Sequence, residues 1–183
     1  MVRLGCLLSI VLIGCRLVCA ATLEQLSLAE MVRQSSAIVL AKAAQSRSIR
    51  AGALIYTLVE VEVLEQWKGE RVARREIALP GGRIGGFSQR FDGVPVLAPD
   101  QEFVAFLWTG PSGRTQLLGL SQGFFDVIRD SQGGIRIHRQ PTADLMFVPG
   151  TTTPVASTAI DMPLEALVAQ ILSVTAAGGP APQ

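Results

Sequence analysis

The most regular alternation of apolar and polar positions runs from Leu54 to Gly69, with the sequence LIYTLVEVEVLEQWKG. β-branched residues occupy one side of an extended chain, while tyrosine, leucine and glutamate residues occupy the other. Because successive side chains of a strand point to opposite faces of a sheet, this pattern predicts one long strand. β-branched side chains suit such a pleated, half-buried surface. We expect this strand to pair along both edges and to organise a β-barrel or sandwich.

Shorter apolar runs predict further strands on both sides of the long one. The run Glu102 to Trp108 is apolar at both alternating positions, which is typical of a central strand covered on both faces. The polar segment Arg47 to Gly52 is interpreted as a turn leading into the long strand. The predicted strands are 37–44, 54–69, 76–79, 87–91, 102–108, 115–120, 124–129, 135–138 and 145–148.

Two helices are predicted, one near each end of the chain. Ser27 and Glu30 have the spacing of a capping box at the start of a short helix. Pro163 stands at the preferred first position of a second helix. Apolar residues then recur at helical spacing, so one face of this helix should dock on the sheet. These residues are Leu164, Leu167, Val168, Ile171 and Leu172.

Residues 1–20 have the pattern of a secretory signal peptide. Arg3 provides the positive start, an apolar run follows, and Ala20 ends a small-residue cleavage site. The alternative is a lipoprotein signal, because residues 12–15 end a short apolar run with Cys15, which would carry a lipid anchor. The apolar run before Arg16 is shorter than the roughly 20 residues that a membrane-spanning helix needs. We therefore expect an exported protein, periplasmic or extracellular, without a membrane span.

Removal of the leader leaves a chain with little net charge and no cysteine. The full sequence has 16 Lys and Arg residues against 15 Asp and Glu, and Arg3 and Arg16 lie in the leader. A near-neutral chain argues against nucleic acid and anionic lipid as partners. All three cysteines, Cys6, Cys15 and Cys19, precede residue 21, so no disulfide, thiol nucleophile or cysteine metal site is expected. Residues 21–175 fit a single domain, and 176–183 are interpreted as a disordered tail.

Three segments carry a resemblance to known proteins: Ser36 to Ala41, the long strand with its ending Lys68-Gly69, and Asp100 to Leu107. The chain resembles a group of uncharacterised exported bacterial proteins and, more distantly, the netrin-like domain of tissue inhibitors of metalloproteinases. The resemblance covers roughly residues 27–129 and implies an OB-like, five-stranded Greek-key β-barrel with an N-terminal and a C-terminal flanking helix. Those inhibitors present an N-terminal, disulfide-held cysteine to the metal of the protease. No residue of this chain matches that cysteine, so the inhibitory function does not carry over.

Residues that could serve catalysis are few. The glycine-rich loop Gly81 to Gly86 lacks the Gly-Lys-Ser/Thr ending of a phosphate-binding loop, and glycines beside strands usually serve bulges or corners. His138 is the only histidine, and sequence spacing alone does not place Asp126, Asp130 or Ser131 beside it. Glu60 and Glu62 are interpreted as solvent-facing strand residues. We expect no catalytic residue, cofactor or metal site.

The arginines at positions 71, 74, 75, 83 and 90 raise the alternative of a basic patch for single-stranded nucleic acid, which OB-like barrels often bind with stacking aromatics. Aromatic residues make up only 5% of the chain and acidic residues are interspersed. Export also separates the protein from cytoplasmic nucleic acid. We interpret these arginines as a solvated rim.

These observations favour an exported, non-catalytic module that binds an envelope or extracellular protein. Loops on a rigid scaffold commonly carry binding, which points to the segments 67–75 and 81–86. An envelope lipoprotein with a structural role and a hydrolase with a site around His138 are the alternatives. The candidate binding residues are Trp67, Lys68, Arg71, Arg74 and Arg83.

Overall fold

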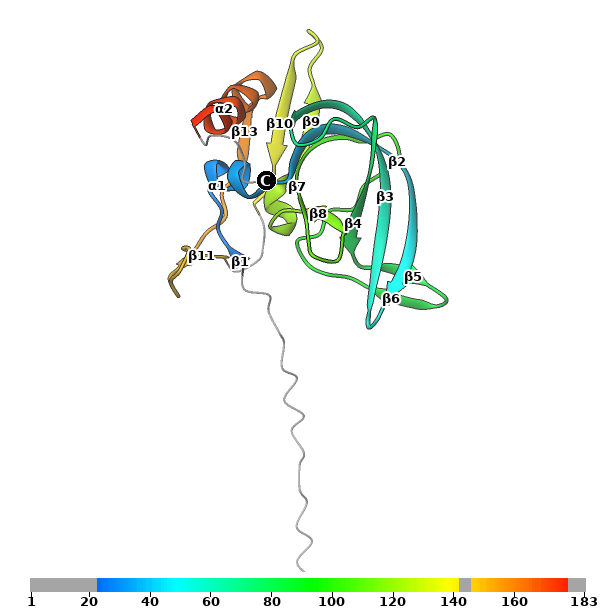
Figure 1. The fold of residues 1–183 in the computed structure, drawn as a ribbon. Helices are drawn as coiled ribbons and strands as arrows, with labels where there is room; N and C mark the ends of the chain where they lie inside the picture. Colours follow the sequence, from blue (N-terminus) through cyan, green and yellow to red (C-terminus); the bar gives the residue numbers. More distant parts are fainter. Residues whose placement is uncertain (1–22, 142–145, 178–183) are drawn as a thin grey trace, which may run out of the picture.

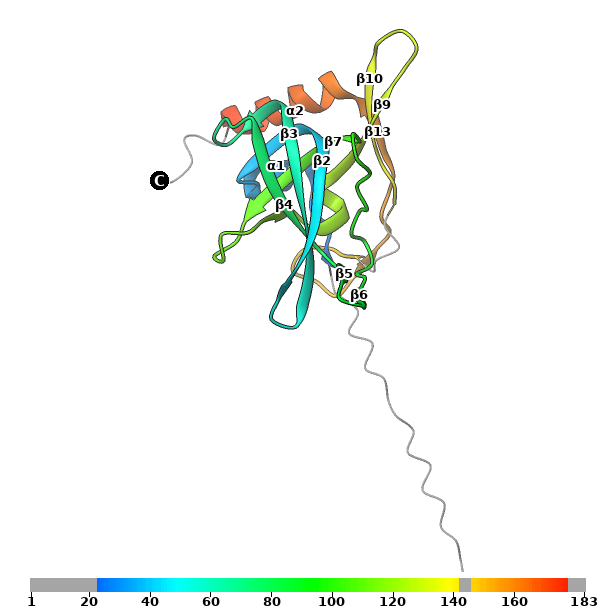
Figure 2. The same cartoon turned by 90° about the vertical axis from the view of Figure 1, so that its right-hand side faces the viewer.

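The computed structural model describes residues 23–141 and 146–177. The fold is mainly β, with a large antiparallel sheet and two α-helices (Figures 1 and 2). The predicted leader, including Cys15, and residues 178–183 of the predicted tail lie outside the described residues. The strands are β1 (Leu23–Glu24), β2 (Ala37–Ala51), β3 (Leu54–Lys68), β4 (Arg74–Pro80), β5 (Gly82–Ile84), β6 (Phe87–Gln89), β7 (Glu102–Thr109), β8 (Thr115–Leu117), β9 (Phe124–Arg129), β10 (Ile135–Arg139), β11 (Met146–Phe147), β12 (Pro154–Val155) and β13 (Ile160–Pro163). The helices are α1 (Leu28–Gln34), the 3-10 turn η1 (Leu120–Gly123) and α2 (Leu164–Ala177).

The long strand predicted from the alternation is confirmed as β3, which pairs with β2 on one edge and β4 on the other. The prediction for β2 was too short. Its polar half, including Arg47 and Arg50, pairs with β3 instead of forming a turn. The turn consists of Gly52 and Ala53 alone, and Gly52 has a φ of +63°, which glycine adopts without strain. Three register shifts between β2 and β3 interrupt the pairing, and such bulges bend a strand pair.

The sheet order is β13-β10-β9-β7-β2-β3-β4, with β8 also paired to β7. β7 is the central strand that its apolar pattern predicts, since Phe103 to Leu107 are all buried. β8 and β9 follow one another along one edge of β7, while β2 occupies its other edge. β13 was not predicted: it pairs with β10, and Pro163 is its last residue rather than the first residue of the helix.

Two apolar cores lie on opposite faces of this sheet. Figure 1 shows β2, β3, β4, β7 and β8 curling around the first core, while α1 and α2 lie against the other face. Alanines of β2 and β7 face the first core, where their small side chains leave room for a tight curl. The buried residues of the first core are Ala37, Val39, Ala41, Ala43, Val59, Val61, Ile77, Leu79, Phe103, Ala105, Leu107, Leu117 and Phe124. Those of the second core are Met31, Val32, Ile38, Leu40, Val104, Phe106, Leu118, Phe125, Ile137, Leu164, Leu167 and Ile171.

The two predicted helices are present, with small differences. Ser27 caps α1 through the predicted capping box with Glu30. Leu164, Leu167 and Ile171 of α2 are buried as expected, whereas Leu172 is 52% exposed. α2 continues to Ala177, so the first two residues of the predicted disordered tail belong to the helix.

The curled part of the sheet has a seam, which we define as the facing edges of β4 and β8. β4 and β8 lie close together, yet among the described strands β4 is hydrogen-bonded to β3 alone. Val94 and Pro95 of the segment 90–101 lie beside both strands, and Val94 and Leu97 pack against the first core. Side chains, rather than backbone hydrogen bonds, therefore close the curl along this line.

The loop predicted at Gly81 to Gly86 is instead a small hairpin, since β5 pairs with β6. It lies beside the turn between β2 and β3. Gln89 accepts from the backbone N–H of Ile55 at 2.6 Å and donates to the carbonyl of Ala53 at 2.8 Å. Both hairpin ends project at the same end of the molecule (Figures 1 and 2).

Candidate functional site

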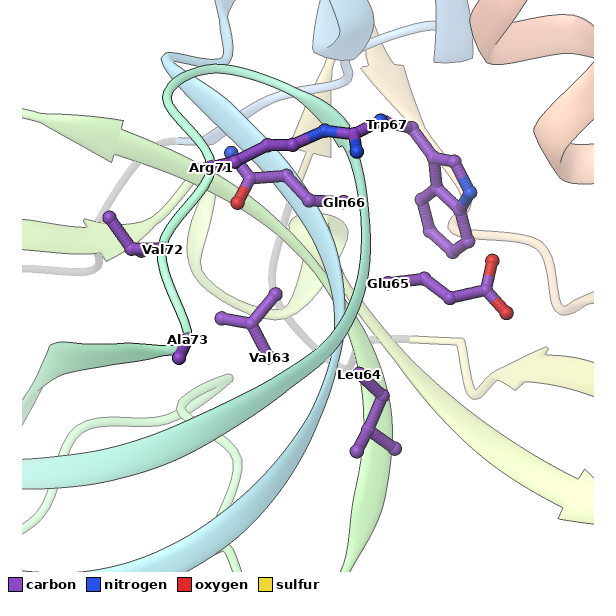
Figure 3. A pocket seen from close by; sticks show the side chains of 8 residues that line it. All are labelled: Val63, Leu64, Glu65, Gln66, Trp67, Arg71, Val72 and Ala73. Atoms are coloured by element: carbon purple, nitrogen blue, oxygen red, sulfur yellow. The ribbon is translucent and has the colours of Figure 1, made fainter.

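The turn from β3 to β4 surrounds an open hollow of about 550 Å³ (Figure 3). Arg71 and Gln66 lie on the inner side of β3, and Trp67 and Glu65 lie on its outer side. The hollow is lined by Val63, Leu64, Glu65, Gln66, Trp67, Arg71, Val72 and Ala73. We call it the β3–β4 hollow.

Two candidate binding residues at this end also support the fold. The ammonium of Lys68 donates to the carbonyls of Val32 at 2.6 Å and Arg33 at 3.0 Å, at the C-terminal end of α1. Burial lowers the pKa of this ammonium from its ordinary value. Trp67 is half-buried and packs against the second core. Replacing either residue would therefore disturb packing as well as any binding.

Gln66 and Arg75 hold the turn together but keep unpaired polar atoms. Gln66 Nε2 donates to the carbonyls of Lys68 at 3.0 Å and Glu70 at 2.5 Å, and Arg75 also donates to the Glu70 carbonyl. Gln66 Oε1 and the Arg75 Nε–H group are buried without a hydrogen-bond partner in the described chain. Such buried, unpaired groups are uncommon in folded proteins and call for a physical reason.

Arg71 is the exposed cation of the β3–β4 hollow. Its side chain runs across Gln66 in Figure 3. Among the described residues it makes no ion pair, whereas the nearby Arg74 contacts Glu60 at 3.1 Å. The carboxylate of Glu62 lies 3.6 Å from Lys42, so Glu60 and Glu62 each pair with a cation rather than with one another.

Arg83 lies at the opposite end of β3 from the other four candidate residues. It belongs to the β5–β6 hairpin, where a second hollow of about 500 Å³ opens between this hairpin and the segment 90–97. Arg90 lines the same hollow. The five arginines at 71, 74, 75, 83 and 90 therefore do not form one patch.

His138 lies between two acidic residues in the sheet, Asp126 on β9 and Asp161 on β13. Its Nδ1 is 3.6 Å from Asp161 Oδ2. The Asp161 carboxylate also accepts from Arg136, and this hydrogen bond, more than the neighbouring His138, lowers its pKa. Sequence spacing missed this arrangement because the pairing of β13 with β10 was not foreseen.

Two buried polar residues were also missed, and both serve the fold. Gln122 accepts from the N–H of Leu26 at 2.8 Å and donates to the carbonyl of Glu24 at 2.9 Å, which attaches the N-terminal segment to η1. Arg139 donates to the Gln122 carbonyl at 2.7 Å and lies over the Phe125 ring. Burial lowers the pKa of Arg139. The partners of both side chains are at least 14 residues away in the sequence, so no local sequence signal marks these residues.

In the part of the chain that the structure describes, no group of three or more His, Cys, Asp or Glu residues is placed to hold a metal ion. None of the described helices has the length and apolar character needed to cross a bilayer. Comparisons with family models, with curated proteins and with solved structures found no match.

Proposed function

We propose that this chain is an exported, non-catalytic binding module, and that the β3–β4 hollow receives an envelope or extracellular partner protein. The observation that carries this proposal is a pair of buried groups without hydrogen-bond partners: Gln66 Oε1, whose residue lines the hollow, and Arg75 Nε, whose residue donates to the same Glu70 carbonyl as Gln66. A partner that displaces Arg71 would offer hydrogen-bonding groups to both. Leaving such groups unpaired costs roughly 1–3 kcal/mol each, so their pairing would favour the bound state.

We further propose that the curled strands form an OB-like Greek-key barrel, as the resemblance to netrin-like domains implies. The approach of β4 to β8 and the single core inside the curl support this assignment. OB-like barrels often bind with the loops at their ends, and the β3–β4 turn is one such loop.

The proposal is tested by placing a photo-crosslinking amino acid at Arg71 in the cell that makes the protein. A matched control carries it at Ile128, which is 48% exposed on β9, a strand that β7 and β2 separate from β3 in the sheet. We expect one light-dependent adduct of defined mass at position 71 and none at position 128. Arg71→Gln and Gln66→Ala should then weaken binding of the identified partner at least tenfold, while Arg71→Gln leaves the thermal midpoint unchanged. Equal adducts at both positions, or none at 71, would remove the support for this site.

The hydrolase alternative has one observation in its favour, the contact of His138 with Asp161. A carboxylate that orients a histidine is a recurring part of acyl-transfer sites. Should the purified protein turn over an ester or peptide substrate, and should His138→Ala abolish that turnover, the non-catalytic proposal would be wrong. The lipoprotein alternative depends on Cys15, and detection of an acylated Cys15 by intact-mass measurement would favour it.

A further inference from the structure

Basic residues outnumber acidic residues around the end of β3 that lies beside the β2–β3 turn. The segments 46–59 and 80–99 contain the arginines at 47, 50, 83 and 90 but only one acidic residue, Asp92. Arg47 is neutralised by Glu76 at 2.5 Å, whereas Arg83 and Arg90 make no ion pair within the described chain. Net charge alone, which is close to zero, conceals this basic end. An anionic partner responds to the local group of arginines rather than to the net charge of the whole chain.

Large apolar side chains are exposed at the same end. Phe87 at the end of the β5–β6 hairpin is 64% exposed, and Leu54 beside the β2–β3 turn is 39% exposed. The two hairpins contact one another, since the Arg50 guanidinium lies 5.6 Å from the centre of the Phe87 ring. We call Arg50, Leu54, Arg83, Phe87 and Arg90 the tip surface.

The hairpin ends extend into open space. A Cβ added at Gly52, Gly85 or Gly86 would meet no atom within 4 Å. The exposed apolar residues therefore stand on separate projecting segments and do not line one pocket. Protein interfaces usually depend on clustered anchors that fill a pocket. A lipid interface accepts separate apolar side chains, provided that they project at the same end, as these two hairpins do (Figures 1 and 2).

We propose that the tip surface docks on an anionic lipid surface. Phe87 and Leu54 would enter the boundary between head groups and acyl chains. Arg50, Arg83 and Arg90 would lie at the level of the lipid phosphates, with their aliphatic stems against the apolar layer. This surface lies at the opposite end of β3 from the β3–β4 hollow, so a bound membrane would leave the hollow open to a protein partner.

The test measures co-sedimentation of the purified protein with lipid vesicles, using the form of the chain that is recovered from the cell. One set of vesicles is pure phosphatidylcholine, and the other also contains phosphatidylglycerol. We expect binding to the phosphatidylglycerol vesicles alone, weakening as salt is added because salt screens the attraction. Arg83→Gln and Arg90→Gln should each weaken binding roughly fivefold. Phe87→Ser should weaken it about tenfold or more, because a buried phenylalanine is lost. Phe87→Trp should bind at least as tightly, since tryptophan favours the membrane interface.

Leu172→Ser is the matched control for the loss of an exposed apolar side chain, and Arg71→Gln is the control for the loss of an exposed arginine. Both should bind vesicles like the unchanged protein, and thermal midpoints should confirm that every variant folds. Absence of vesicle binding at low salt, or equal weakening by Phe87→Ser and Leu172→Ser, would overturn the proposal. Retention on polyglutamate beads without vesicle binding would assign the tip surface to an acidic protein and would likewise overturn it. Arg71→Gln should weaken binding of the partner protein and leave vesicle binding unchanged. The proposal for the β3–β4 hollow and the proposal for the tip surface can therefore fail independently.

Discussion

Gly82 lies where the chain turns from β4 into β5, with a φ of +142°. A Cβ at this position would approach Thr57 Oγ1 at 2.7 Å and Ser48 Oγ at 2.8 Å, closer than such atoms pack. Gly85 differs from Gly82 in two respects: its φ is +52°, and no atom lies within 4 Å of an added Cβ. The corner role expected for glycines in this segment therefore fits Gly82, while Gly85 has a conformation that asparagine also adopts.

We expect Gly82→Ala to lower the free energy of unfolding by about 1–3 kcal/mol, since the new side chain is strained and crowded. Gly85→Asn should change it by less than about 1 kcal/mol, because asparagine tolerates this conformation. Denaturant titration of the two variants measures both values. A larger loss for Gly85→Asn than for Gly82→Ala would contradict this account of the corner.

Sequence reasoning identified Lys68 and Arg71 by residue type but could not distinguish their roles. The Lys68 ammonium donates to the Arg33 carbonyl of α1, 35 residues earlier in the chain, whereas Arg71 makes no ion pair among the described residues. Which cation is occupied depends on tertiary contacts, and spacing along one strand carries no information about them. The unpaired atoms of Gln66 and Arg75 were unpredictable for the same reason.

Elements governed by local spacing were predicted well. The capping box needs only Ser27 and Glu30, three positions apart, and it was found as expected. The alternation that defines β3 is equally local. The polar half of β2 was missed because its strand conformation depends on pairing with β3, which compensates for weak strand propensity. β13 depends in the same way on β10.

The capping box gives α1 a predictable pH dependence. Glu30 accepts from the Ser27 N–H and hydroxyl, and these hydrogen bonds lower the pKa of its carboxyl group. A lowered folded-state pKa means that this stabilisation is present above the unfolded pKa of about 4.3 and is lost as the pH falls through the folded value. Ser27→Ala should cost about 1 kcal/mol at neutral pH.

Glu30→Gln is the matched variant, because glutamine retains a hydrogen-bond acceptor but does not titrate. Its stability should fall less steeply than that of the unchanged protein between about pH 5 and 3. Denaturant titrations across this range compare the two. Parallel curves for the two proteins would show that Glu30 contributes nothing to the loss of stability at acid pH.

At the level of the whole molecule, the predicted mainly β composition with two helices is confirmed, whereas the hydrogen-bonded closure that a barrel implies is not found between β4 and β8. The apolar patterns of β3 and β7 indicate which faces are buried, because burial on a sheet face follows alternation. They do not indicate whether the last two edges become hydrogen-bonded. Here Val94 lies beside both β4 and β8 and packs against the first core, and its segment has neither strand nor helix periodicity from which its position could be inferred.

The seam makes one line of the molecule open more easily than the rest. Amides that point from β4 toward β8 lack a strand partner in the described structure, so deuterium should replace their hydrogens through brief local separations rather than through global unfolding. Backbone amides that are hydrogen-bonded between β2 and β3 should exchange far more slowly. Val94→Ser should accelerate hydrogen exchange in β4 and β8 and leave exchange in β10 and β13 unchanged. Equal acceleration in all four strands would mean that the sheet opens as one unit. Proteases would attack the chain first along this line, so its lifetime among proteases would depend on the side chains that cover these two strand edges rather than on its total stability.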